Sequence, residues 1–193
     1  MATKVYELIA PCHFGLEAVL KKEILDLGYE ISQVEDGKVT FLGDAEAICR
    51  ANIFLRTTER ILLKVGSFRA TTFEELFQGT KNLPWEDYIP QDGKFWVKKA
   101  NSLKSKLFSP SDIQSIMKKA MVERMKQAYG IAVVPETGTS YPLRVSLFKD
   151  VVTVALDTTG ESLHKRGYRK LTSKAPIEET LANAWKWQKA LDK

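Results

Sequence analysis

The chain of 193 residues lacks the short motifs by which several enzyme classes hold phosphates or present a nucleophile. The nucleotide-binding spacings G-x-G-x-x-G and G-x-x-x-x-G-K-[ST] are absent, and so is the G-x-S-x-G turn of α/β-hydrolases. The carboxylates are scattered, and the pair Glu74–Glu75 is typical of the charged first turn of a helix. The sequence therefore shows no catalytic residues, although a small enzyme with an unrecognised site stays open as an alternative.

Cysteine and histidine are scarce, with two residues of each type. Cys12 and Cys49 are too few for a disulfide framework, so a reducing, cytoplasmic location is the default expectation. His13 follows Cys12 directly, but no further Cys or His stands at metal-ligand spacing, and His164 lies far along the chain. We therefore expect no metal site.

Long hydrophobic runs are also missing. No segment approaches the roughly 18 apolar residues of a membrane span, and the start MATKVYELIA lacks the pattern of a signal peptide. We expect no membrane partner. The hydrophobic share of 44%, with nine Phe, six Tyr and four Trp, argues against disorder, and the length suits one or two domains with real cores.

Charge is unevenly distributed along the chain, although its sum is only +5. Residues 94–126 hold nine basic and two acidic side chains, a net charge of +7. Residues 164–175 hold five basic side chains and no acid, and the remaining segments are neutral or acidic. Concentrated basic segments favour nucleic-acid binding, because each phosphate that they neutralise releases a condensed counterion. A solvated lysine-rich surface is the alternative.

Hydrophobic spacing in the first 68 residues predicts the order strand–helix–strand–strand–helix–strand. Asp36-Gly37 predicts a hairpin turn, Gly28 the end of the first helix, and Asp44 the N-cap of the second. This order is typical of a ferredoxin-like βαββαβ domain within an α+β fold. The predicted strands occupy residues 5–9, 29–34, 38–42 and 60–68, and the predicted helices residues 16–27 and 44–55.

A second mixed unit follows. Thr71–Glu75 resembles a capping signal before a short helix, and residues 94–100 alternate as a strand. Ser109-Pro110 predicts the start of a long helix, with the serine hydroxyl as N-cap, and Tyr129-Gly130 predicts its end. A hairpin around Lys149-Asp150 is predicted next. The expected core stripe of the long helix is Ile113, Ile116, Met117, Ala120, Met121, Met125 and Ala128.

The basic residues of this unit are the candidates for phosphate contacts. Lys98, Lys99, Lys104 and Lys106 are expected in a polar basic loop, residues 98–106, between the strand and the long helix. Trp96 is a candidate stacking surface or a packed side chain. The face of the helix opposite its core stripe adds Lys118, Lys119 and Lys126.

Three segments of the sequence resemble segments of a known protein family. They are Pro11-Cys-His-Phe-Gly15-Leu-Glu17, Ser105-Lys-Leu-Phe-Ser-Pro-Ser-Asp112-Ile-Gln114 with its continuation to Ala120, and Leu163-His-Lys-Arg166-Gly167-Tyr168-Arg169. They are similar to the THUMP-containing RNA methyltransferases, and more narrowly to bacterial proteins that methylate guanine N2 in large-subunit ribosomal RNA. The resemblance covers nearly the whole chain.

The resemblance implies a ferredoxin-like domain at residues 1–68 and a THUMP α/β domain at residues 69–163, which binds folded RNA. Residues 164–193 would be a basic linker and the start of a methyltransferase domain. The family's Rossmann-like catalytic domain, with its glycine-rich S-adenosylmethionine loop and Asn/Asp-Pro-Pro-Tyr/Phe motif, is absent from these residues. We therefore expect no cofactor in this chain. Arg166, Tyr168 and Arg169 are expected to contact RNA or to brace the junction with that domain, and Lys165 is expected to contact RNA. Trp185 and Trp187 are expected to belong to the interface with that domain.

The expected function is the binding and positioning of structured RNA, ribosomal in the favoured case, for a methyltransferase domain in cis or in trans. The chain alone is expected to be inactive. The alternative is a stand-alone RNA-binding adaptor, for ribosomal or transfer RNA, whose catalytic partner is a separate chain.

Overall fold

The computed structural model describes residues 4–165 and 178–184. The chain forms two compact units, one of residues 1–63 with 158–193 and one of residues 64–157. Residues after Asp157 therefore return to the first unit, which differs from the expected boundaries at 68 and 163. The return is held by backbone bonds, because Thr158 N donates to the carbonyl of Ile61 at 3.1 Å and Leu163 N to that of Glu59 at 2.8 Å.

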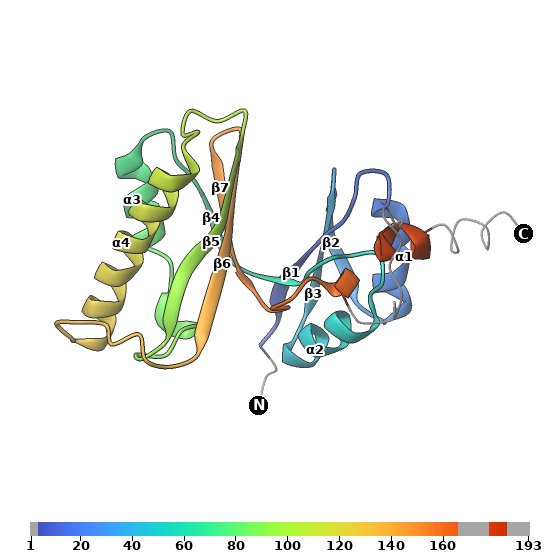
Figure 1. Cartoon of the computed structure of the whole chain (residues 1–193), viewed down its shortest axis with the longest axis horizontal. Coiled ribbons are helices and arrows are strands. Elements are labelled where there is room, and N and C mark those ends of the chain that lie inside the picture. The colour runs from blue at the N-terminus through green and yellow to red at the C-terminus, as the bar shows by residue number, and fades with distance from the viewer. Residues whose placement is uncertain (1–3, 166–177, 185–193) are drawn as a thin grey trace, which may run out of the picture. The chain divides into compact units, whose positions relative to one another are not determined.

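The first unit has the expected ferredoxin-like element order, with two helices on one side of a sheet (Figure 1). Its strand order is β2-β3-β1-β4, and the pairing of β1 with β3, β1 with β4 and β2 with β3 is antiparallel. The elements are β1 (Tyr6–Pro11), α1 (Glu17–Asp26), β2 (Glu30–Glu35), β3 (Lys38–Gly43), α2 (Ala45–Phe54) and β4 (Leu62–Arg69).

The predicted helix signals of this unit are confirmed. Asp44 caps α2 by accepting a hydrogen bond from Ala47 N at 2.9 Å, and Gly28 follows α1 with a φ of +89° that favours glycine. The core lies between the helices and the sheet, and it is formed by buried residues of β1, α1, β3 and α2 and of the adjoining chain: Leu8, Ala10, Leu20, Ile24, Val39, Phe41, Ala47, Ala51, Leu55 and Ile61.

Glu17 at the start of α1 ties two turns together. Its carboxylate accepts hydrogen bonds from Gly37 N in the β2–β3 turn and from Gly15 N, each at 2.8 Å. These backbone donors, Gly37 first, hold the pKa of Glu17 below its usual range. Gly15 and Glu17, both in the segment 11–17, therefore have structural roles. Glu17 accepts the two backbone hydrogen bonds, and Gly15 adopts a φ of +87°, which favours glycine.

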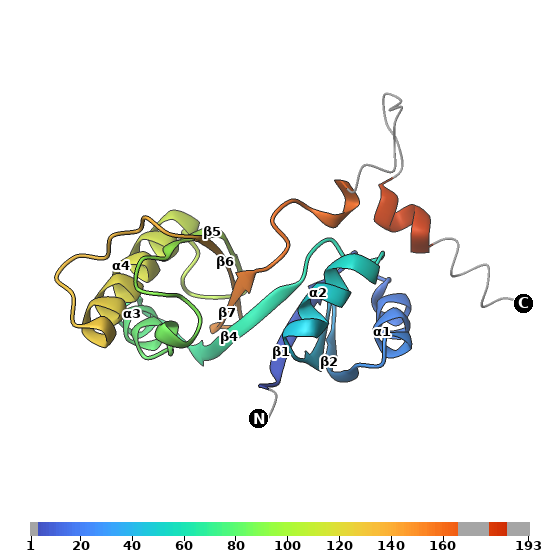
Figure 2. The ribbon, with the colours of Figure 1, turned by 90° about the horizontal axis from the view of Figure 1, so that it is seen from below.

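The second unit has the strand order β4-β7-β6-β5, and α3 and α4 cover one side of this sheet (Figures 1 and 2). Strand β5 pairs with β6 in parallel, and the two are connected through α4, whereas β6 and β7 form an antiparallel hairpin. The elements are α3 (Phe73–Lys81), the short 3₁₀ turn η1 (Trp85–Asp87), β5 (Lys94–Leu103), α4 (Pro110–Tyr129), β6 (Ser140–Phe148) and β7 (Val151–Asp157), and the 3₁₀ turn η2 (Leu163–Lys165) follows in the first unit.

The capping signal before α3 is confirmed. Thr72 Oγ1 accepts from Glu75 N at 3.2 Å, and the Glu75 carboxylate accepts in return from Thr71 N at 2.6 Å. That backbone bond is the main cause of a lowered pKa of Glu75. Both partners thus satisfy backbone donors at the start of the helix, as a capping box does.

The start of α4 corrects one expectation. Ser109 occupies the N-cap position, but its side chain makes no capping hydrogen bond and lies 3.2 Å from the hydroxyl of Ser111 instead. The expected core stripe is buried at five of its seven positions, whereas Ile116 is half-buried and Ala128 is exposed near the end of the helix. Gly130 ends α4 in the left-handed region, as expected.

Among the residues described, no helix combines the length and apolar character that crossing a membrane requires.

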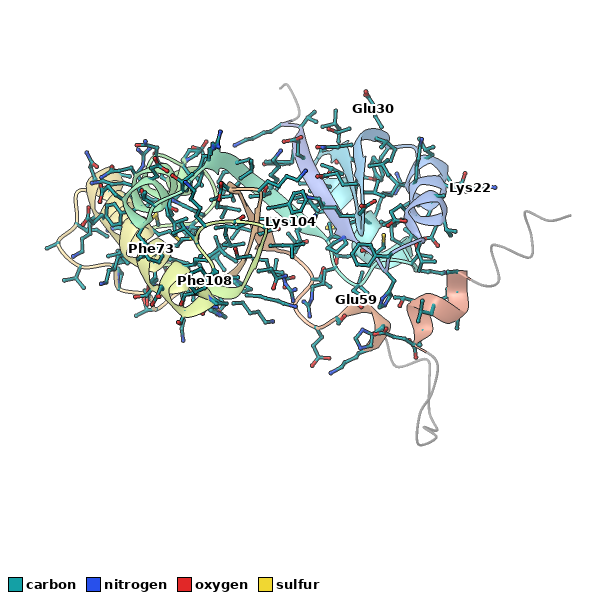
Figure 3. All side chains as sticks on the ribbon, turned by 90° about the horizontal axis from the view of Figure 1, so that it is seen from above. Lys22, Glu30, Glu59, Phe73, Lys104 and Phe108 are labelled. Atoms are coloured by element: carbon teal, nitrogen blue, oxygen red, sulfur yellow. The ribbon has the colours of Figure 1, made fainter. Side chains whose placement is uncertain are left out.

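Glu23 provides a stability test of the first unit. It is buried in α1, and its carboxylate accepts from Arg56 N at 3.1 Å, Thr57 N at 3.2 Å and Thr57 Oγ1 at 2.8 Å. Glu23→Ala leaves these donors without their acceptor, and we expect a loss of about 2–4 kcal/mol in the free energy of unfolding, measured by urea denaturation followed by circular dichroism. The exposed Glu30, labelled in Figure 3, gives the control, since Glu30→Ala should change stability by less than about 0.5 kcal/mol. Equal effects of the two changes would contradict this role of Glu23.

Candidate nucleic-acid interface

The segment that joins β5 to α4 has a defined conformation. Ser102 Oγ donates to the carbonyl of Leu107 at 2.5 Å, and Ser105 Oγ donates to that of Leu103 at 3.1 Å. The side chain of Leu107 is buried, and Lys104 adopts a φ of +52°. These contacts hold the backbone while Lys104 and Lys106 stay exposed.

The turn between β6 and β7 is bonded to this segment. Lys106 N donates to the Asp150 carboxylate at 2.8 Å, and Asp150 N donates to Ser105 Oγ at 2.9 Å. Lys149 and Asp150 both have positive φ, 50° and 64°, which is typical of a two-residue type I′ hairpin turn. The carbonyl of Asp150 also accepts from Ala70 N at 2.9 Å, so three chain segments meet at one end of the sheet.

We call this end of the second unit the basic tip, and we define it by the exposed cations Arg69, Lys104, Lys106 and Lys149. Each of them lies on one of the three bonded segments. The carboxylate of Asp150 accepts from a backbone amide at the same place. Four cations held on rigid backbone can contact several phosphates without a large ordering cost.

Exposed apolar side chains accompany these cations. Phe108 is 81% exposed and Leu103 61%, and the neighbouring Phe148 of β6 is also exposed. The ammonium of Lys149 lies 5.3 Å from the centroid of the Phe148 ring. Lys104 and Phe108 are labelled in Figure 3 on the same segment. Exposed aromatic rings among cations can stack on unpaired bases while the cations hold the backbone.

Lys98 and Lys99 are exposed, but they lie in β5 and not in the expected loop, because the strand continues to Leu103. Lys98 is at an irregularity of the β5–β6 ladder, and Lys99 is level with Arg144. Trp96 is 36% exposed and pairs in register with Pro142, so its ring is only partly available for stacking.

The three lysines predicted on the basic face of α4 are not equally exposed. The ammonium of Lys118 is bonded to Glu136 and to the carbonyl of Phe95, and it lies 3.8 Å from the centroid of the Phe95 ring. Its ammonium is therefore paired within the second unit, although the Lys118 side chain is about one-third exposed. Lys119 is exposed and Lys126 half-buried.

Acidic side chains also pair with other cations near α4. Arg124 on this helix is bonded to Glu86, and this guanidinium is the main cause of a lowered pKa of Glu86. Lys81 pairs with Glu123 at 3.0 Å. The surface near α4 thus carries less net positive charge than its lysines suggest.

The second basic segment of the sequence is largely outside the described residues. Lys165 is exposed in η2 of the first unit. Arg166 and Arg169 lie outside the described residues, as do Gly167, Tyr168, Trp185 and Trp187.

Sequence reasoning did not single out Arg69, Lys149 or Phe108 as binding residues. The sequence feature that could have indicated them is the succession of strand β5, helix α4 and strand β6. Such an order is typical of parallel strands joined by a crossover, and the ends of parallel strands meet at the same edge of a sheet. The residues after β5 and after β6 are neighbours for that reason.

Two family models match the chain. The model for the RlmL ferredoxin-like domain matches residues 7–62, and the model for the THUMP domain matches residues 70–157. The two matched segments fall in the first and second structural units respectively.

Individual proteins are similar over almost the whole chain. "Putative RNA methyltransferase YpsC" of Bacillus subtilis is 52% identical over 183 residues, which are 94% of this chain and 47% of that protein. "Ribosomal RNA large subunit methyltransferase K/L" of Cellvibrio japonicus is 28% identical over 92% of this chain and 24% of its own length. The solved structure of SMU.472, described as "a putative methyltransferase complexed with SAH", matches with a TM-score of 0.89 and 43% identity over 97% of this chain and 49% of that chain. The chain thus spans about half the length of the first and third of these proteins.

The bond between Lys106 N and Asp150 tests whether the basic tip is held rigidly. Asp150→Gly suits the positive φ at this position but removes the carboxylate, and we expect amide hydrogen exchange at Lys106 to become about ten-fold faster. Asp150→Asn keeps an acceptor oxygen and should leave the exchange near that of the unchanged chain. If the glycine variant also exchanged at the original rate, the bond would have no part in ordering the segment.

Proposed function

Because the chain belongs to the THUMP-containing RNA methyltransferase family, with an RlmL-type ferredoxin-like domain ahead of its THUMP domain, we propose that it binds and positions structured RNA for methyl transfer. The observation that carries this proposal is the basic tip, where four exposed cations and an exposed phenylalanine lie on bonded backbone. The tip belongs to the THUMP segment apart from Arg69, which directly precedes it.

We further propose that the RNA is ribosomal and that the modified atom is N2 of a guanine in 23S rRNA. The name of the Cellvibrio relative supports the large-subunit RNA, and the resemblance of the three sequence segments to guanine-N2 methyltransferases supports the atom. An RNA-modifying role would be exercised in the cytoplasm.

The methyl group would come from S-adenosylmethionine bound by a separate domain, in cis or in trans. The description of SMU.472 as complexed with SAH supports this cofactor, and that protein is about twice as long as the matched segment. This chain would contribute the capture of RNA, so we expect its affinity for RNA to be independent of added S-adenosylmethionine.

The charge of the basic tip gives the first binding test. Lys104→Glu with Lys106→Glu should lower the affinity for a structured rRNA fragment at least ten-fold, because two phosphate contacts become repulsive. The slope of log affinity against log salt should become shallower by about 1.5–2, measured by fluorescence anisotropy at several salt concentrations. Lys21→Glu with Lys22→Glu on α1, in the other unit, is the charge-matched control (Lys22 is labelled in Figure 3) and should change neither quantity by more than a small fraction of that. Unchanged binding by the double variant would remove the basic tip from the interface.

Phe108 gives a test that separates stacking from charge. Phe108→Ala should weaken binding of RNA with unpaired nucleotides by about 1–3 kcal/mol, whereas the salt slope should stay the same because no cation is lost. Phe73→Ala is the matched control, since Phe73 is also exposed, at 40%, but lies on α3 (Figure 3). Equal losses from the two alanine variants would contradict a stacking role for Phe108.

A further inference from the structure

Both histidines of the chain lie beside one glutamate in the first unit, although they are far apart in the sequence. His13 Nε2 is 2.9 Å from Glu178 Oε2 and 3.4 Å from Glu59 Oε1. His164 Nδ1 is 3.6 Å from the other carboxylate oxygen of Glu178, and it is 2.8 Å from the hydroxyl of Ser162. This cluster is not part of the basic tip, and the proposed capture of RNA does not use it.

Hydrogen bonds of the surrounding backbone place His13 and Glu59 next to each other. The buried Thr58 donates its hydroxyl to the carbonyl of Pro11 at 2.6 Å, so the segment before β4 is fastened to the end of β1. The carbonyl of Glu59 accepts from Leu163 N at 2.8 Å, which adds the returning segment that contains His164. The backbone segments that hold His13, Glu59 and His164 are thus joined by bonds that need no ligand in the cluster.

Glu178 reaches the cluster from the last described helical segment. It directly precedes the helical residues 179–184, and its carbonyl accepts from Ala182 N at 3.0 Å. The side chains of Glu178, Glu59 and His13 are each between one-third and two-fifths exposed. Water therefore has access to the cluster, and a bound ion could keep water ligands.

Hydrogen bonding by His13 Nε2 cannot satisfy both neighbouring carboxylates. One imidazole nitrogen faces oxygens of two carboxylates, but a single N–H group can donate fully to only one of them. The ligand atoms of His13, Glu59 and Glu178 all lie within 4.8 Å of one another. Atoms that share one metal ion through bonds of about 2.0–2.2 Å lie about 3–4 Å apart, so small rotations of half-exposed side chains would complete such a set.

We propose that His13, Glu59 and Glu178 form a binding site for a divalent transition-metal ion of the Zn²⁺ type. One imidazole nitrogen and two carboxylate oxygens suit Zn²⁺, whereas Mg²⁺ and Ca²⁺ prefer oxygen ligands alone. The ion neutralises the two carboxylates and leaves the imidazole nitrogen to coordinate as a neutral ligand.

The bound ion cross-links distant parts of the first unit. Its ligands come from the turn after β1, from the segment before β4 and from the start of the last described helical segment, 165 positions after His13. The ion therefore fastens the chain beyond the THUMP segment, which ends at residue 157, to the ferredoxin-like domain. The proposal does not depend on RNA binding.

The test is a Zn²⁺ titration of the 193-residue chain, after removal of metal with EDTA, in competition with a chromophoric chelator. We expect one ion per chain, and we expect His13→Gln, Glu59→Gln and Glu178→Gln each to lower the affinity at least ten-fold. Glu179→Gln and Cys12→Ser are the matched controls, since each alters a neighbour of a ligand and should leave the affinity unchanged. Zn²⁺ should also raise the midpoint of thermal unfolding of the unchanged chain, but not that of His13→Gln.

Circular dichroism in EDTA confirms that each variant is folded before Zn²⁺ is added, so a loss of binding is distinguished from a loss of structure. The proposal is overturned if the unchanged chain binds no Zn²⁺, or if His13→Gln and Glu178→Gln bind it as tightly as the unchanged chain. It is also overturned if Cys12→Ser abolishes binding and the glutamate variants do not, because a thiol would then be the ligand. If only metal-independent stability falls in the variants, the cluster is an ion pair and no metal site.

Discussion

The parallel pairing of β5 with β6 is the constraint on which the candidate interface depends. Parallel strands end at the same edge of a sheet, so the segment after β5 and the turn after β6 meet, although about 45 residues separate them in sequence. Asp150 and Ser105 then bond the two segments to each other. Without that pairing, Lys104 and Lys149 would belong to unrelated loops, and the positive charge would have no single location.

The local signals of the sequence predicted most elements. Asp44, Thr72 and Gly130 act at helix ends as their residue types suggest, and the Lys149-Asp150 turn forms the expected hairpin. Such signals depend on a few neighbouring residues, so they can be recognised without knowledge of the fold. Ser109 is the exception, because its hydroxyl lies near Ser111 and makes no capping bond.

Contacts between distant residues account for what the sequence did not predict. The sequence predicts Lys118 on a basic helix face, but in the structure its ammonium is bonded to Glu136 and to the carbonyl of Phe95. His13 had no metal-ligand partner at any regular spacing, yet the fold places it against Glu59 and Glu178. The charge profile along the chain singled out residues 94–126, but it could not show which of the cations in this segment are exposed together.

Contact of RNA with the THUMP unit at the basic tip can be measured by hydrogen–deuterium exchange of the chain with and without a structured rRNA fragment. We predict that RNA slows amide exchange in residues 103–109 and 149–151, while the exchange of residues 118–126 in α4 stays unchanged. Protection confined to α4 or to the ferredoxin-like domain, with none at the basic tip, would exclude the basic tip as the site of RNA contact.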